Sequence, residues 1–224
     1  MKPVAPPAAR RIFGRQVHLA ERYAELLVTA GIERGLIGPR EAPRIWERHI
    51  LNCAVVHPAI PIGCAVTDIG SGAGLPGVVL AIIRPDLTMT LVEPMQRRSD
   101  FLRTVVAELG LGNTSVLRAR ADELVGVVSA DVVTARAVGP LDQLVRWSIP
   151  LLASGGVLVA LKGRSILAEV ARAAPVLREL GAVSWRVEEY GSGIVEPATR
   201  AAIVEVRTRI GKAVTHRRPT KGNR

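Results

Sequence analysis

The sequence has no long hydrophobic stretch. Its 224 residues are 48% hydrophobic, yet no run approaches the roughly 18 to 20 uninterrupted apolar residues that a membrane helix needs. The first residues, MKPVAPPAARRIF, lack the apolar centre of a signal peptide. We therefore expect a cytoplasmic protein with no membrane association.

Cysteine and aromatic residues are also scarce. Cys53 and Cys64 are the only cysteines, and they form neither a CxxC pair nor a Cys/His cluster. We therefore expect no metal site, and we interpret both thiols as small buried apolar groups. The few aromatic side chains are interpreted as core residues rather than as stacking platforms for a nucleobase; they are Phe13, Tyr23, Trp46, Phe101, Trp147, Trp185 and Tyr190.

An excess of positive charge is missing from the middle of the chain. Residues 51–206 hold fourteen Lys/Arg against fifteen acids, whereas residues 1–50 hold nine against five and residues 207–224 hold seven against none. The net charge of +10 therefore comes from the two ends. Basic ends around a near-neutral middle favour a catalytic core held against a polyanion such as RNA. A solvated terminal tail is the alternative.

The length favours one catalytic domain with an appendage, working as a monomer. Apolar residues recur at helical spacing from Ile12 to Leu27 and again from Ile45 to Ala54. We predict an N-terminal helical extension over 1–60, a main domain over 61–210, and a basic tail over 211–224 that is disordered without a ligand.

From residue 65 the pattern changes to short apolar runs that alternate with helical stretches. Such runs predict parallel strands joined by crossover helices, which is a doubly wound α/β fold. A helix over 166–180 precedes two further runs, which predict an antiparallel closing hairpin. The expected strands are 65–70, 88–93, 114–119, 130–135, 156–161, 183–190 and 201–208.

A glycine-rich turn, DIGSGAGLPG, follows the first predicted strand. Gly70, Gly72, Gly74 and Gly77 let the backbone turn sharply and approach a ligand closely, and Pro76 suits the start of a helix. The spacing also satisfies the dinucleotide fingerprint, with Glu93 ending the second strand where a ribose-binding acid belongs. A nucleoside-containing cofactor is therefore predicted, and its identity stays open at this point.

Three features favour S-adenosylmethionine over NAD. Asp68 stands two residues before the first glycine, which resembles the first motif of class I methyltransferases. The third strand is followed by Ala121 and Asp122, where a carboxylate can accept from the adenine amine. Neither tyrosine is followed by a lysine four residues later, as one dehydrogenase class requires.

The chain resembles a bacterial family, the 16S rRNA guanine-N7 methyltransferases known as RsmG or glucose-inhibited division protein B. The likeness runs from about residue 44 to residue 162. Its motifs are RHIL (48–51), the 68–77 loop with its Leu-Pro-Gly ending, RP (84–85), RR (97–98), ARA (135–137) and LKG (161–163). The family implies a methyltransferase fold and transfer from S-adenosylmethionine to guanine N7 in 16S rRNA.

The resemblance also implies site residues. Cofactor contacts fall on Gly70, Gly72, Leu75, Glu93, Ala121, Asp122 and Arg136. Arg136 is predicted to position the reactants at the carboxyl end of the fourth strand. No general base is assigned, because guanine N7 carries a lone pair and no proton. The candidates for RNA contact are Arg48, His49, Lys162 and Arg164.

The sequence departs from the family pattern at several positions. Asn52 and Cys53 replace a usual Asp-Ser pair, and residues 29–43 lack the Trp-Asn and Asn-Leu-Thr signature. Leu75 replaces a frequent phenylalanine and Glu93 a frequent aspartate, and both replacements preserve the role.

Three alternatives remain. An NAD-linked oxidoreductase shares the glycine spacing but lacks an evident proton donor. A non-catalytic RNA-binding assembly factor can keep the fold without turnover. A methyltransferase for adenine or cytosine amino groups often carries Asn/Asp-Pro-Pro-aromatic after the fourth strand, where this chain has ARAVGP.

Overall fold

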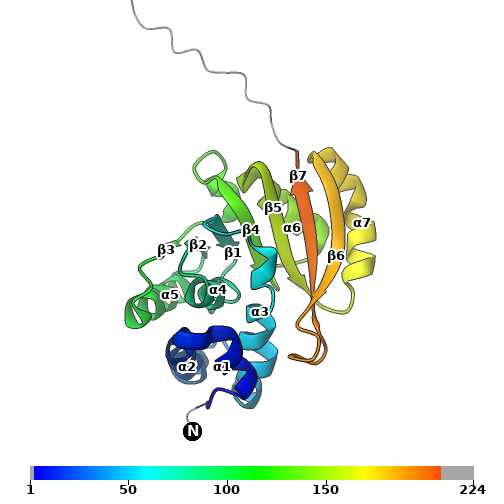
Figure 1. Ribbon diagram of the computed structural model, residues 1–224. Helices are drawn as coiled ribbons and strands as arrows, with labels where there is room; N and C mark the ends of the chain where they lie inside the picture. The colour runs from blue at the N-terminus through cyan, green and yellow to red at the C-terminus, as the bar shows by residue number, and fades with distance from the viewer. Residues whose placement is uncertain (1–2, 208–224) are drawn as a thin grey trace, which may run out of the picture.

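A single seven-stranded sheet runs through the protein. The computed structural model describes residues 3–207 (Figure 1). The strand order is β3-β2-β1-β4-β5-β7-β6, with β7 antiparallel to both neighbours and the other pairs parallel. The strands are β1 (Ala65–Ile69), β2 (Thr88–Val92), β3 (Thr114–Leu117), β4 (Ala130–Arg136), β5 (Leu152–Lys162), β6 (Ala182–Tyr190) and β7 (Thr199–Val206).

The predicted sheet and its antiparallel closing hairpin are confirmed. The main difference lies in β5, which begins at Leu152 rather than at residue 156. Leu152 pairs with Ala130 before the register shifts, and regular pairing resumes where Val157 lies opposite Val132. Such an irregular stretch carries no alternating apolar pattern, so the sequence did not indicate it.

Helices cover both faces of the sheet, as a doubly wound fold requires. Val132 and Val159 face the layer that contains α4 and α5, whereas Val133 and Leu158 face α6 and α7. The helices are α1 (Pro7–Phe13), α2 (Val17–Leu26), α3 (Asn52–Ala54), α4 (Gly77–Ile83), α5 (Gln96–Leu109), α6 (Leu141–Ser148) and α7 (Ile166–Glu179).

Residues 3–60 are largely helical and pack on α4 and α5 (Figure 1). Both predicted helical stretches are present. The second begins as a π-helix, η4 (Ile45–Leu51), and continues into α3. This segment shares one hydrophobic core with β1, β2 and the neighbouring helices. A domain boundary near residue 60 stays a prediction. The other short helices are η1 (Gly14–Gln16), η2 (Leu27–Gly31), η3 (Pro39–Arg44), η5 (His57–Ala59), η6 (Ala121–Leu124) and η7 (Ile149–Leu151).

Arg84 joins the N-terminal segment to the turn before β2. Its guanidinium donates to the carbonyl oxygens of Ile60 at 2.8 Å and Pro61 at 2.9 Å, and it forms an ion pair with Asp86 at 2.6 Å. The side chain is largely buried. The arginine of the Arg-Pro motif therefore fixes the chain just before β1 starts, rather than contacting a ligand.

Residues 3–207 contain no helix that is both long and apolar enough to cross a bilayer. In the same range, no cluster of three His, Cys, Asp or Glu side chains could hold a metal ion. The predicted basic tail, residues 211–224, lies outside the described part of the chain.

The close approach of α4 to the sheet gives a first prediction. A Cβ on Gly77 would lie 2.3 Å from a Leu91 methyl carbon and 2.7 Å from Asp68 Oδ2, both buried. We expect Gly77→Ala to lower the free energy of unfolding by about 1–3 kcal/mol. Urea unfolding measures the loss. Gly112→Ala is the control, because a Cβ there meets no atom within 4 Å; equal stability of the two variants would contradict the packing argument.

Candidate active site

Two cavities open at the carboxyl edge of the parallel strands. The smaller, of about 170 Å³, is mostly apolar. Ligands of doubly wound folds bind at this edge, where the strand order reverses. In this sheet the order reverses between β1 and β4. The lining residues are Ile69, Gly70, Val92, Pro94, Ala119, Arg120, Ala121, Asp122, Val138 and Trp147.

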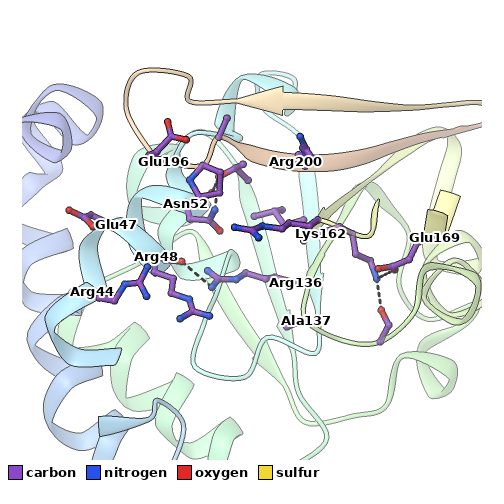
Figure 2. Close-up of a pocket in the computed structure, with 17 residues that line it drawn as sticks. Arg44, Glu47, Arg48, Asn52, Arg136, Ala137, Lys162, Glu169, Glu196 and Arg200 are labelled. Atoms are coloured by element: carbon purple, nitrogen blue, oxygen red, sulfur yellow. Dashed lines mark hydrogen bonds and ion pairs between the residues drawn. The ribbon is translucent and has the colours of Figure 1, made fainter. Parts of the chain in front are cut away.

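The larger cavity, of about 950 Å³, is strongly basic. Six cationic side chains line it against three acids, Glu47, Glu169 and Glu196. Figure 2 shows Arg44 and Arg48 reaching toward Arg136 from the N-terminal helical segment, with Arg200 on the opposite side. Such a surface suits a polyanion. The cationic residues are Arg44, Arg48, Arg136, Lys162, Arg164 and Arg200.

The segment that follows β4 separates the two cavities. Ala137 and Gly139 line the large cavity, and Val138 between them lines the small one. Val138 packs directly against Gly70, where a Cβ would lie 2.8 Å from a valine methyl carbon. Ala137 has φ +56°, a left-handed conformation that costs a non-glycine residue about 1 kcal/mol or more. A group passing from one cavity to the other must pass beside this segment.

The glycine loop is held in place by side chains from three different elements. Asp68 in β1 accepts the Gly77 N–H at 3.1 Å, and Glu93 after β2 accepts the Gly72 N–H at 3.0 Å. The hydroxyl of Tyr23 in α2, fully buried, donates to the Ala73 carbonyl oxygen at 2.8 Å. The loop conformation therefore depends on the N-terminal helices as well as on the sheet.

Glu93 has the geometry of a sugar-binding acid. Its residue is 1% exposed, and besides Gly72 it accepts the Met95 N–H at 3.0 Å. Each carboxylate oxygen accepts one of these two bonds, so each retains a lone pair. Two hydroxyl groups on one sugar match that remaining capacity. The residues at this edge therefore fit a nucleoside, and the contact of its sugar with Glu93 stays a prediction.

Burial dominates the chemistry of Asp68. The residue is fully buried, and its Oδ1 accepts the Thr134 hydroxyl at 3.1 Å. Loss of solvent raises the pKa of Asp68 to about 7, and the hydrogen bonds from its neighbours lower it only in part. Asp68 thus joins β1, β4 and the start of α4 beneath the glycine loop. It lies too deep to contact a ligand directly.

Arg136 points toward the N-terminal segment. Its terminal nitrogens donate to the carbonyl oxygens of Arg48 at 3.2 Å and His49 at 3.3 Å, to Cys53 Sγ at 3.0 Å and to His49 Nδ1 at 3.2 Å. These four bonds use every N–H of the two terminal nitrogens. Arg136 lines the large cavity, and its contacts make it an anchor between β4 and the end of η4. Its predicted contact with the cofactor stays a prediction.

His49 mediates part of this connection. Its Nε2 lies 2.8 Å from Glu41 Oε2 while Nδ1 faces Arg136. Burial, the largest effect, lowers the pKa of His49, so the imidazole is neutral at pH 7. Nδ1 then accepts from Arg136 and the Nε2–H donates to Glu41. The structure places His49 behind the basic surface, whereas Arg48, 53% exposed, stands on it.

Lys162 also forms its ion pair and its hydrogen bond with groups inside the protein. Its side chain is 8% exposed, forms an ion pair with Glu169 at 2.8 Å and donates to the Gly139 carbonyl oxygen. Glu169 in turn accepts the Leu141 N–H at 3.1 Å. The pair therefore fixes the C-terminal end of the segment that separates the two cavities, through Gly139 and Leu141. Figure 2 shows Lys162 directed toward Glu169. Arg164 lines the large cavity with an exposed side chain.

The remaining predicted cofactor residues divide into two groups. Gly70, Ala121 and Asp122 line the small cavity, and Asp122 forms an exposed ion pair with Arg120 at 3.2 Å. The Leu75 N–H points to the Ser71 carbonyl oxygen at 3.2 Å, so it closes the turn instead of facing a ligand. The predicted contact of Leu75 with the cofactor stays a prediction for its other atoms.

Several residues of the site were not indicated by the sequence. Arg44, Asn52 and Arg200 line the large cavity. Asn52, one of the departures from the family pattern, donates to the Thr199 hydroxyl at 2.6 Å and so joins α3 to β7. These residues carry no motif spacing because the large cavity brings together segments about 150 positions apart. For Arg44 and Arg200, the positive charge of the side chain was the only indication in the sequence.

The fold has relatives among solved methyltransferases. A SAM-dependent O-methyltransferase from Thermotoga maritima superposes with a TM-score of 0.56 at 14% identity, covering 77% of this chain and 72% of that one. TYW2 from M. jannaschii, solved in complex with AdoMet, gives a TM-score of 0.54 at 14% identity, covering 70% and 74%. The architecture is that of a class I S-adenosylmethionine-dependent methyltransferase.

Sequence comparison gives the family. The model of GidB, the rRNA small subunit methyltransferase G, matches residues 16–194. The protein named ribosomal RNA small subunit methyltransferase G from Salinispora tropica is 51% identical, covering 99% of this chain and 94% of that protein. The protein of the same name from Streptomyces avermitilis is 53% identical, covering 91% and 86%. The chain therefore belongs to the rRNA small subunit methyltransferase G family.

The buried Asp68 gives a prediction about pH. A folded-state pKa of about 7 lies above the unfolded value of 3.8, so the folded state holds a proton that the unfolded state releases. Asp68 thus makes stability fall as pH rises from about 4 to 7. Asp68→Asn mimics the protonated form. We expect its stability relative to the native chain to rise by about 3 kcal/mol between pH 5 and pH 8.

Chemical denaturation at several pH values measures that difference. Parallel stability curves for the two proteins would place the Asp68 pKa below 5 and contradict the effect of burial. Asp100→Asn, at a half-exposed carboxylate on α5, is the matched control for the same substitution outside the core.

The internal contacts of Lys162 distinguish it from Arg164. Lys162→Met leaves Glu169 without its cation, although Ser165 and the Leu141 N–H still donate to that carboxylate. We expect a loss of about 1–3 kcal/mol in the free energy of unfolding. Arg164→Met should stay within about 0.5 kcal/mol of the native chain and should weaken RNA binding. If Lys162→Met unfolded like the native chain and lost only RNA affinity, Lys162 would be a surface contact after all.

Proposed function

We propose that this chain transfers a methyl group from S-adenosylmethionine to N7 of a guanine in 16S ribosomal RNA. The observation that carries the proposal is the pair of adjoining cavities. The small apolar cavity with Glu93 beside it suits a nucleoside cofactor, and the large basic cavity suits RNA. The names of the relatives, ribosomal RNA small subunit methyltransferase G, support the same substrate.

S-adenosylmethionine supplies an electrophilic methyl group on sulfur. Guanine N7 needs no proton removed before it attacks, so the protein has to align the reactants rather than provide a base. Alignment of atoms about 3–3.5 Å apart can lower the barrier by several kcal/mol. Residues 137–139, held by Lys162, and the glycine loop, held by Asp68, lie where the two cavities approach each other. These two segments supply that alignment.

Arg136 acts in this proposal as a positioning residue. Its four bonds to η4 and α3 fix Arg48 and its neighbours against the carboxyl end of β4. The guanidinium charge stays at the cavity wall, where it attracts a phosphate or the guanine O6 while N7 remains free to react. Arg136→Ala should therefore reduce both stability and methyl transfer.

A monomer as the working form of the chain stays a prediction. Membership in a methyltransferase family disfavours the NAD-linked oxidoreductase. The same membership also disfavours the non-catalytic assembly factor.

Transfer of labelled methyl groups to 16S rRNA decides between these candidates. The RNA should come from cells that lack this protein, both free and as assembled small subunits. We expect label in N7-methylguanine at a single position. Glu93→Ala is the control and should bind S-adenosylhomocysteine more than about tenfold more weakly, through loss of charged hydrogen bonds to the sugar. Cofactor binding without any methyl transfer would establish the assembly factor, and label on another base would overturn the N7 assignment.

A further inference from the structure

Trp147 differs from the other two tryptophans in its surroundings. Trp46 is 7% exposed and donates its indole N–H to the Pro3 carbonyl oxygen at 3.2 Å. Trp185 lies on β6 with the Arg178 guanidinium 5.6 Å from its ring centroid. Trp147 is instead half-buried and lines the small cavity. Trp147 also packs against the core between the sheet and helices α6 and α7, so its ring is shared between that core and the cavity.

The position of Trp147 follows from the register of α6. The helix buries Leu141, Leu144, Val145 and Ser148 against the sheet. Trp147 follows Leu144 by three residues, so it lies at the border of the buried face rather than on the opposite side. Its ring is therefore held by the core on one edge and open to the cavity on another. A ring fixed in this way offers a rigid surface with little entropy left to lose on binding.

The cavity itself has the size of one ring system. Its volume of about 170 Å³ is below the roughly 300 Å³ at which pockets for drug-sized ligands begin. Ile69, Val92 and Val138 supply aliphatic walls, and Asp122 supplies a carboxylate at the rim. Trp147 is the one aromatic side chain in this lining. A heterocycle with an exocyclic amine matches that combination of apolar walls and one acceptor.

The same ring supports the segment between the cavities. A Cβ on Gly139 would lie 3.8 Å from Trp147 Cζ3, and Lys162 holds the Gly139 carbonyl oxygen from the other side. Residues 137–139 are thus fixed between the tryptophan and the Lys162–Glu169 pair. Filling the small cavity against Trp147 would steady the segment that borders the RNA cavity.

We propose that Trp147 is a cofactor-binding residue that forms the aromatic wall of the adenine site. This inference rests on the proposed function, because it assigns the small cavity to the base of S-adenosylmethionine. Stacking of a base on an aromatic ring makes a several-fold to hundredfold difference in affinity. Contact with a purine also changes the emission of an indole, so the tryptophan reports occupation of its own site.

Fluorescence and calorimetric titration with S-adenosylhomocysteine test the proposal. The native chain and the control Trp185→Phe should show a saturable change in tryptophan emission. Trp147→Phe should lose that change while calorimetry shows binding within a few-fold of the native value, because phenylalanine keeps an aromatic face. Trp147→Leu should bind roughly 5- to 100-fold more weakly, with the circular dichroism spectrum retained.

Two results would overturn the assignment of Trp147. One is a Trp147→Phe variant that keeps the full emission change, and the other is a Trp147→Leu variant that binds as tightly as the native chain. Either result leaves the proposed methyl transfer standing. If the native chain gave no calorimetric signal with S-adenosylhomocysteine, the proposed function and the assignment of Trp147 would both fail.

Discussion

The conformation of the loop after β1 is the constraint on which the rest of the site depends. Asp68 from below, Glu93 from the neighbouring strand and Tyr23 from the N-terminal helices each bond one backbone group of this loop. Such short polar contacts inside an apolar core are costly to break singly. They explain why the N-terminal helices share one core with the sheet.

The basic cavity depends on a second set of internal bonds. Arg136 binds the end of η4, and the Lys162–Glu169 pair binds Gly139 and Leu141 at the C-terminal end of the segment after β4. Two of the cations that line the cavity thus act inside the protein, and the exposed Arg44, Arg48 and Arg164 are left for phosphates. Cations that stabilise the fold therefore line the same cavity as the exposed cations that we propose bind the RNA.

Local patterns in the sequence were sufficient for the sheet, its closing hairpin and the place of Glu93. Alternating apolar runs report strands directly, and parallel strands bring their carboxyl ends to one edge. The direction of a long side chain is not local. Lys162 was expected at the RNA, and the structure turns it toward Glu169. Asn52 and Thr199 form a hydrogen bond although they are 147 positions apart in the sequence. Trp147 was interpreted as a core residue because the sequence pattern of its helix indicates a buried face but cannot indicate a cavity.

The central claim is that the loop and Glu93 hold the sugar of S-adenosylmethionine beside the small cavity. A crystal structure of the chain with S-adenosylhomocysteine tests it most directly. The account predicts both ribose hydroxyls within hydrogen-bonding distance of the Glu93 carboxylate and the adenine against Trp147. A nucleoside bound elsewhere, with Glu93 still bonded only to the N–H groups of Gly72 and Met95, would contradict it.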